Sequence, residues 1–288
     1  MTKHDISLLS FSQLPPLLRE IPDPPRQLYL RGKLPDTNKI FLTVVGSRKS
    51  TGYGRETCRQ LIRGLKDKPV CIVSGLALGI DALAHQTALE VGLSTLAVPG
   101  SGLQDNVIAP ASNRRLAFEI LNQGGGLLSE LSPKQPAEKW TFPSRNRIMA
   151  GLAQLVLVIE AGERSGTLIT ARLAAEYNRD VGAVPGSIRE PQSTGTNSLI
   201  AEGAYPIISQ QYLLQLLDLE DTASSTDNDI PPYLSPEEQE VLKQLEKPQN
   251  REELVEKVSI SFTQLQITLT KLEMKGLANE SDGKWSAR

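Results

Sequence analysis

The sequence predicts an α/β protein, with an extended Rossmann-like parallel sheet followed by a small winged-helix domain. Three observations lead to this fold class. Short runs of Val, Leu and Ile without polar alternation recur between residues 40 and 184, as in parallel strands covered on both faces. Amphipathic segments of helical length separate these runs, which is the order that βαβ units produce. Residues 233–288 then show three helical patterns and two short strands, which is typical of a winged helix.

Length and composition exclude several classes of protein. A chain of 288 residues has room for one large domain and a small one. The net charge of −2 gives no overall basic signature, although residues 41–215 carry slightly more basic than acidic side chains. Cys58 and Cys71 lack metal-ligand spacing and are expected to be core thiols, so neither a metal nor a cofactor is predicted. No signal peptide or membrane-spanning run is found, and a cytoplasmic location without membrane association is expected.

We divide the chain into four parts. Residues 1–38 are rich in proline and are expected to form an N-terminal arm along the next domain, where residues 28–30 could add a short strand. Residues 39–215 hold the Rossmann-like domain. Residues 216–232, polar and ending in two prolines, form a linker. Residues 233–288 form the winged helix.

The Rossmann-like domain alternates strands and helices along the chain. Strands are expected at 40–45, 70–74, 94–98, 126–129, 155–159 and 181–184. Helices are expected near 53–66, 80–91, 111–122 and 167–177, with a further short helix before the strand at 155–159.

The ends of these strands carry most of the functional information. Nearly every crossover begins with glycine beside a hydroxyl or cationic residue, as in Gly46-Ser47-Arg48, Ser74-Gly75, Gly100-Ser101-Gly102, Ser165-Gly166-Thr167 and Gly186-Ser187. The carboxyl ends of parallel strands share one sheet edge, and glycine lets bare amides face a ligand. The pattern therefore predicts a phosphate-binding rim, with tight turns alone as the alternative.

One stretch, residues 142–171, concentrates this chemistry. It joins an Arg-Asn-Arg triplet, a fully apolar strand and a helix that Ser165 or Thr167 can cap. The free amides at a helix N-terminus can hold an anion. In the alternative interpretation the arginines are solvated surface charges and Ser165 only caps the helix.

Four other side chains admit two interpretations. Asp81 and His85 lie four residues apart on a helix, which suits a metal or general-base pair, but Asp81 more simply fixes the preceding loop through its amides. Glu130 and Glu160 end strands and could bind a ribose hydroxyl. They could equally pair with Arg145 or Arg147 and hold those side chains in place.

In the winged helix, the third helix offers Thr263, Gln264, Gln266 and Thr268 but only two cations, and the first two helices are acidic. Reading of base edges needs polar or basic side chains, so a protein-contact module is favoured over a DNA reader.

The motifs together resemble one family, the DNA-processing protein DprA, also called Smf. The matching segments are PDPPRQLYLRG, VVGSRKSTGYG, IVSGLALGIDALAHQTAL, AVPGSGL, GGGLLSE, FPSRNRIMAGLAQLVLVIEAGERSGTLITARLAAEYNRDVGAVPG and STGTNSLIAEGA, in the family's order. The resemblance implies a domain that binds single-stranded DNA, forms a homodimer, and passes the strand to a RecA-type recombinase during natural transformation. Family members are not known as enzymes in that role, so no catalytic residue is expected.

The resemblance and the glycine-rich rim also imply which residues bind the DNA backbone. The residues implied are Gly46, Ser47, Arg48, Gly75, Gly79, Asp81, Gly100, Gly102, Arg114, Arg115, Arg145, Asn146, Arg147, Ser165, Gly166 and Thr167. Arg48, Arg145 and Arg147 would supply the main charge. Binding of this kind is independent of sequence and sensitive to salt.

Two departures from the family pattern leave a second function open. Leu78 stands where the family often has Arg or Lys, and the segment after Gly102 lacks the usual Asp and Tyr-Pro. The alternative is a nucleotide sensor or hydrolase, similar to the cytokinin-activating phosphoribohydrolases. Their PGGxGTxxE motif supplies a catalytic glutamate, and the nearest match here, residues 99–104, has no glutamate at that spacing.

Overall fold

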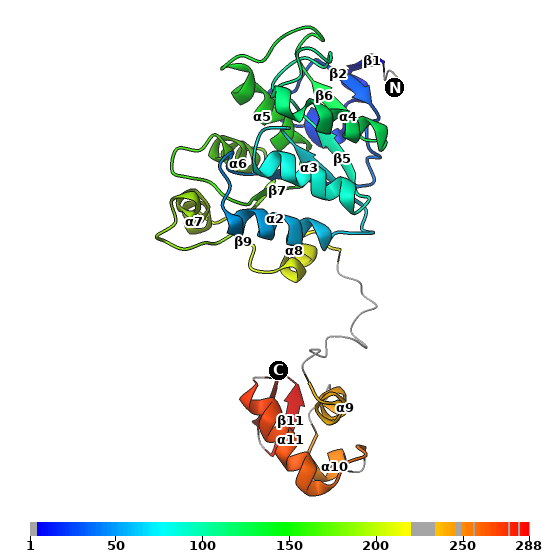
Figure 1. The fold of residues 1–288 in the computed structure, drawn as a ribbon, viewed down its shortest axis with the longest axis vertical. Coiled ribbons are helices and arrows are strands. Elements are labelled where there is room, and N and C mark those ends of the chain that lie inside the picture. Colours follow the sequence, from blue (N-terminus) through cyan, green and yellow to red (C-terminus); the bar gives the residue numbers. More distant parts are fainter. Residues whose placement is uncertain are drawn as a thin grey trace. The chain divides into compact units, whose positions relative to one another are not determined.

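The structure is a computed structural model that describes residues 5–219, 234–245, 249–255, 257–275, 277–281 and 283–287. The chain divides into two compact units, residues 1–220 and residues 221–288, and each is considered by itself (Figure 1).

The described part of the first unit is built on a mixed sheet of nine strands, in the order β1-β2-β6-β5-β4-β3-β7-β8-β9. Strands β3 to β9 run parallel to one another, whereas β2 pairs antiparallel with β6 and β1 pairs antiparallel with β2. The bounds are β1 (Ile6–Ser10), β2 (Gln27–Gly32), β3 (Ile40–Val45), β4 (Val70–Ser74), β5 (Ser94–Ala97), β6 (Gly126–Ser129), β7 (Leu155–Val158), β8 (Asp180–Ala183) and β9 (Tyr205–Pro206).

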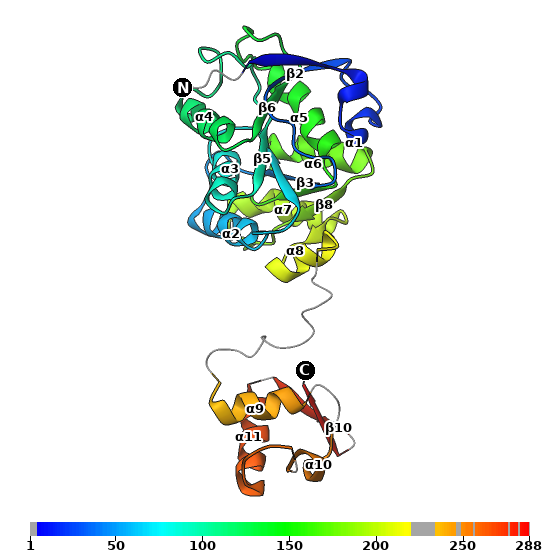
Figure 2. The same cartoon turned by 90° about the vertical axis from the view of Figure 1, so that its right-hand side faces the viewer.

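Helices cover both faces of this sheet (Figure 2). In β3, Leu42 and Val44 pack into one apolar cluster while Phe41 and Val45 pack into another, which is why the strand is apolar throughout. One face carries α1 (Pro16–Arg19), α5 (Thr141–Leu152), α6 (Thr167–Glu176) and α7 (Thr194–Ala201). The other carries α2 (Gly52–Arg63), α3 (Ile80–Glu90), α4 (Arg114–Asn122) and α8 (Gln210–Leu216). Short 3-10 helices η1 (Phe11–Gln13), η2 (Ala111–Asn113) and η3 (Pro191–Ser193) complete the unit. The predicted α/β class is confirmed.

The proline-rich N-terminal segment contributes directly to this sheet and its core. Strand β2 pairs with β6, where Tyr29 faces Ser129 in register, and β1 pairs with β2 at the edge. Leu18 and Leu28 are fully buried. Arg179 donates from Nη2 to the Leu17 carbonyl at 2.9 Å. The short strand expected at residues 28–30 is therefore present, and the segment before it adds a second strand.

The second unit has its own core. It comprises α9 (Pro236–Gln244), α10 (Arg251–Val255), α11 (Phe262–Met274), β10 (Ala278–Ser281) and β11 (Lys284–Ala287). Ser235 and Ser261 each form a capping box that fixes the start of a helix. Val241, Leu265 and Trp285 belong to one buried cluster. Three helices and an antiparallel pair are the predicted winged-helix elements.

The predicted linker, residues 216–232, lies partly outside the described residues. Leu216 ends α8 and Leu217 is buried beneath it, so the packed unit continues into the expected linker. Residues 220–232 are among those not described, as is Asp282 of the predicted hairpin turn. Within the described ranges, no helix combines the length and apolar character needed to cross a membrane.

Candidate nucleic-acid interface

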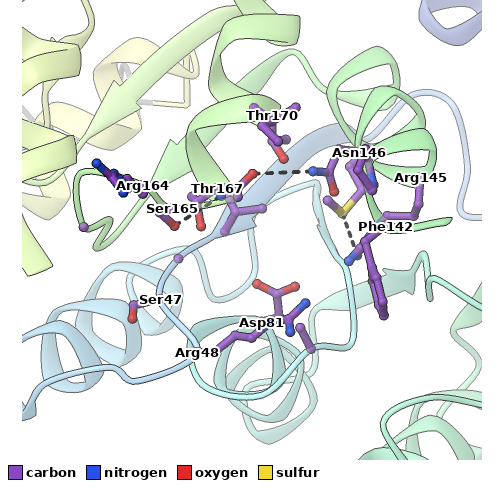
Figure 3. Close-up of a pocket in the computed structure, with 18 of the residues that line it drawn as sticks. Ser47, Arg48, Asp81, Phe142, Arg145, Asn146, Arg164, Ser165, Thr167 and Thr170 are labelled. Carbon is purple, nitrogen blue, oxygen red and sulfur yellow. Dashed lines mark hydrogen bonds between the residues drawn. The ribbon is translucent and has the colours of Figure 1, made fainter. Parts of the chain in front are cut away.

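A pocket of about 460 Å³ opens at the carboxyl ends of β3 and β7 (Figure 3). The chain winds from β3 through β4 and β5 to β6 in one direction, and then through β7 and β8 to β9 in the other. Ligands of open α/β sheets bind where the winding direction changes in this way. The pocket walls come from the loop after β3, the start of α3, the first turns of α5 and the loop before α6.

The pocket brings together many of the predicted site residues. Those that line it are Gly46, Ser47, Arg48, Asp81, Arg145, Asn146, Ser165, Gly166 and Thr167. They come from four separate crossovers, as expected for strand ends that share one edge of the sheet.

Two predicted glycines shape the wall from behind. A Cβ on Gly75 would lie 1.4 Å from Nη1 of Arg145, so this glycine makes room for the guanidinium. Gly79 has φ of +78°, and a Cβ there would lie 2.2 Å from the Ser47 carbonyl oxygen. Glycine is needed at position 79 for both its conformation and the close approach of the loop after β3.

Arg145 and Asp81 form a buried charged pair at the back of the pocket. Arg145 donates from Nη1 to the Val98 carbonyl at 2.9 Å, and no hydrogen-bond partner for its Nε is found among the described residues. Asp81 Oδ2 accepts the Gly75 N–H at 3.2 Å, so it fixes the preceding loop as one interpretation predicted. Burial raises the pKa of Asp81 and lowers the pKa of Arg145, and the charge of each opposes the shift of the other.

Arg48 is an exposed cation that lines the pocket. Its guanidinium carbon lies 5.3 Å from the centroid of the Phe142 ring, within cation–π range. Lys49 and Arg164 also line the pocket. Phe142, Lys49 and Arg164 were missed by sequence reasoning. The available signal was an aromatic residue three positions before Arg145.

The N-terminus of α6 forms the opposite wall. The N-cap of α6 is Gly166 and no side chain caps it, so the prediction that Ser165 or Thr167 caps this helix is wrong. Ser165 Oγ accepts the Thr167 N–H at 3.2 Å from the loop that borders the pocket. The Nδ2 of Asn146 donates to the Gly166 carbonyl at 3.5 Å and ties this loop to α5. The positive end of the helix dipole thus faces the same space as Arg48.

Besides Gly75 and Gly79, the predicted residues Gly100, Gly102, Arg114 and Arg115 lie outside the pocket lining. Gly100 supports Phe142 from behind, because a Cβ there would lie 2.6 Å from the ring. A Cβ on Gly102 would lie 2.3 Å from a carbonyl of the loop before α5. Arg114 donates to the carbonyls of Asn106 and Ile108 and so holds the loop before α4. Arg115 is exposed and pairs with Glu119 at 2.9 Å.

The structure does not bring Arg147 into the pocket either. Both Glu130 oxygens accept from its Nη2, at 2.7 and 2.6 Å, and its Nη1 donates to the Asp23 carbonyl at 2.9 Å. Arg147 therefore fastens the N-terminal segment to α5. Glu130 takes the pairing role that was one of its two predicted alternatives.

Glu160 anchors the loop after β3. It accepts the Thr51 N–H at 2.9 Å and also the Thr51 hydroxyl. A Cβ on Gly54 would lie 2.2 Å from the Glu160 carboxyl carbon, so the close approach of α2 depends on that glycine. The two predictions for Glu160 were a ribose ligand and a partner of Arg145 or Arg147. Among the described residues its carboxylate instead pairs with Thr51, and no ion pair with either arginine is found.

The remaining candidate for proton or metal chemistry is fully buried. His85 Nδ1 lies 2.7 Å from the Thr95 hydroxyl, and burial lowers the His85 pKa to about 3. Burial raises the pKa of the Cys58 and Cys71 thiols to about 12. Across the described ranges, no group of three His, Cys, Asp or Glu residues is placed to hold a metal ion.

Comparison with known proteins adds independent information. The family model for DNA recombination-mediator protein A matches residues 6–218, and the model for the DprA winged helix domain matches residues 225–284. The chain is 43% identical to protein Smf of Escherichia coli over 203 residues, which cover 70% of this chain and 54% of that protein. It is 45% identical to DNA processing protein DprA of Streptococcus pneumoniae over 197 residues, 68% of each chain. The chain thus spans about half the length of the Escherichia coli relative.

Two solved structures share the fold of the first unit. DNA processing protein A from Streptococcus pneumoniae matches with a TM-score of 0.68 and 40% identity, covering 74% of this chain and 75% of that one. DNA processing protein A from Helicobacter pylori, described for its single-stranded DNA binding mode, matches with a TM-score of 0.65 and 30% identity. That match covers 74% of this chain and 96% of the Helicobacter chain.

Proposed function

This chain belongs to the DNA recombination-mediator protein A family, and on that premise we propose that it binds single-stranded DNA independently of sequence and loads a RecA-type recombinase onto the strand. The observation that carries the proposal is the composition of the pocket. Arg48, Lys49 and Arg164 offer charge to phosphates, the α6 N-terminus offers amides, and Phe142 offers an aromatic face. Cations combined with aromatic stacking surfaces are what sequence-independent single-strand binding requires.

The aromatic side chain favours a single strand over a duplex. Phe142 lies in the pocket wall with the Arg48 guanidinium over its ring. A base that has left its own stack would stack on the guanidinium plane of this pair or replace it on the ring. A duplex would offer phosphates to Arg48 but no base face to Phe142. Preference for the single strand is therefore expected to depend on the ring, and attraction to DNA in general on the cations.

The alternative, a nucleotide hydrolase, finds little support in the pocket. Asp81 is the acidic side chain among its lining residues, and that carboxylate is buried and accepts the Gly75 N–H. Glu160 is occupied by Thr51. A general base has to reach the proton that it removes, and these carboxylates hold loops instead. We therefore propose a binding function without catalysis.

The proposed partners follow from the same function. A homodimer would place two pockets on one strand and raise the effective affinity without new contacts. In the second unit, α11 exposes Phe262 and Ile267, and Lys275 at its end pairs with Glu238 at 2.7 Å. Apolar side chains on this helix suit a protein contact better than a DNA groove. We place the protein in the cytoplasm, where the single strand and the recombinase would meet.

Fluorescence anisotropy of a labelled oligo-dT tests the proposal. Tight binding that weakens with salt, and that exceeds binding to a duplex of the same length, is expected. Competition with thymidine monophosphate separates the two functions, because a nucleotide sensor would release the oligonucleotide at low nucleotide concentration. Equal affinity for duplex and single strand, or full displacement by the mononucleotide, would contradict the proposal.

A further inference from the structure

We propose that Trp140 forms a second stacking position for a base, outside the pocket, so that a bound strand continues over the N-terminus of α5. The inference rests on the proposed function and extends its binding surface. It assigns a ligand contact to a residue that belongs to neither the pocket nor the predicted site.

Trp140 immediately precedes α5 and is 52% exposed. Its indole Nε1 donates to Glu138 Oε2 at 2.9 Å, so the polar atom of the ring is already satisfied by its own loop. What the indole offers to a ligand is its flat apolar surface. Tryptophan gives the largest stacking area of any side chain, and every base has a π-face that can use it.

The backbone that carries Trp140 is fixed. The next residue, Thr141, is buried and donates from its hydroxyl to the Gly100 carbonyl at 2.6 Å. The Ser144 hydroxyl donates to the Trp140 carbonyl at 3.1 Å. Because the mounting is rigid, stacking on the indole would cost little conformational entropy.

Trp140 is close in the chain to residues that line the pocket. Pro143 follows Trp140 by three positions, and residues three apart lie on the same side of a helix, about 5–6 Å apart at Cβ. Pro143 and Phe142 both line the pocket. A strand that leaves the pocket over Pro143 therefore reaches Trp140 next.

The loop before α5 supplies charge beside the indole. Lys134 and Lys139 are both exposed, and the contacts of the described residues include no ion pair for either. Glu138, which accepts the indole N–H, is the acidic member of this loop and keeps its charge, so with the two lysines residues 131–140 carry a net charge of +1. The loop is held in place by backbone bonds from Gly102 to Gln135 at 2.8 Å and from Gln104 to Pro133 at 3.0 Å. The close approach of this loop also explains why residue 102 is a glycine, because a Cβ there would lie 2.3 Å from the Ser132 carbonyl oxygen.

Intrinsic fluorescence gives a direct test, because the chain has two tryptophans. Trp285 is 3% exposed in the core of the second unit, so Trp285→Phe leaves Trp140 as the sole tryptophan, which can be excited selectively over tyrosine. Titration of this variant with oligo-dT should quench its emission in step with binding followed by anisotropy of a labelled strand. A mononucleotide, which can fill only the pocket, should leave the emission unchanged.

Affinity measurements on Trp140→Ala complete the test. Loss of one base stack should weaken binding of a long oligo-dT by about 5-fold to about 150-fold, with an unchanged salt slope, while Trp140→Phe restores most of the affinity. Phe11→Ala, which removes another exposed aromatic ring that does not line the pocket, serves as the matched control and should bind as the parent does.

Two results would overturn the inference in distinguishable ways. If oligo-dT binds tightly but Trp140 emission does not change and Trp140→Ala binds like the parent, the strand does not pass over the indole. If the parent protein binds no oligo-dT at all, the proposed function fails and this inference fails with it.

Discussion

Substitution of Arg48 and of Arg147 tests whether the pocket binds phosphate, because only one of the two guanidinium groups lines the pocket. Arg48 is exposed and lines the pocket beside Phe142. The Arg147 side chain is 15% exposed and is already paired with Glu130 and Asp23. Arg48→Ala should therefore remove a phosphate contact, whereas Arg147→Ala should remove an internal fastening.

The expected magnitudes differ in kind. One phosphate contact on a single strand contributes about 0.7 to the slope of log affinity against log salt. Raising the salt from 50 to 200 mM lowers the affinity of both proteins, and the fold-decrease for Arg48→Ala should be about 2.5 times smaller than that for the parent. Arg147→Ala should keep the parent slope. It should instead lower the free energy of unfolding by about 1–3 kcal/mol, because partly buried Glu130 loses its charged hydrogen-bond donor.

Anisotropy titrations at four or more salt concentrations measure the slopes, and urea unfolding measures the stabilities. A slope for Arg147→Ala as shallow as that for Arg48→Ala would mean that Arg147 leaves Glu130 and contacts the strand. An unchanged slope for Arg48→Ala would refute the role of Arg48 as a phosphate contact. It would also refute the proposal that the strand binds at this side of the pocket.

Three further predictions concern buried groups. The His85 pKa falls from about 6.5 to about 3 on folding, so its contribution to stability is complete above pH 6.5 and is lost as pH falls. At pH 4 this loss amounts to about 3 kcal/mol relative to pH 7. The free energy of unfolding of His85→Gln should therefore fall less steeply between pH 7 and pH 4 than that of the parent. Equal dependence on pH in the two proteins would contradict the lowered pKa of His85. Gly75→Ala should displace Arg145 and weaken single-strand binding. The control Gly52→Ala, where an added Cβ meets nothing within 4 Å, should bind as the parent does. Equal binding by the two variants would contradict the role of Gly75 in positioning Arg145. The buried Cys58 and Cys71 thiols, with their pKa raised to about 12, should react with a thiol reagent only on unfolding, and rapid labelling of the folded protein would reveal local opening.

The parallel strands could be predicted because burial on both faces demands unbroken apolar runs such as residues 155–159. Strand β1 could not, because at the sheet edge only Leu9 of its residues is buried and no periodicity results. The contribution of the N-terminal segment depends on β6, which lies far along the chain, and local patterns carry no information about such a partner.

The location of the site could be predicted because the carboxyl ends of parallel strands lie at the same edge of a sheet. The detail depended on the rotation of α5. Residues two apart on a helix differ by about 200° around its axis, so Arg145 and Arg147 cannot both face the pocket. Which of the two does so is decided by packing, as are the partners of Glu130 and Glu160. Those contacts join crossovers far apart in sequence.

The bond from Thr51 to Glu160 spans 109 residues and crosses the line where the sheet changes winding direction. The side of the sheet from β3 to β6 is complete once Ser129 has been synthesised, yet the wall formed by α6 begins only at Thr167. One face of these strands packs on α5, so a nascent chain that ends at Ser129 lacks both that cover and the walls of the pocket. A ligand in this pocket would therefore contact elements from both directions of winding, and the pocket is complete only when both have closed on β3.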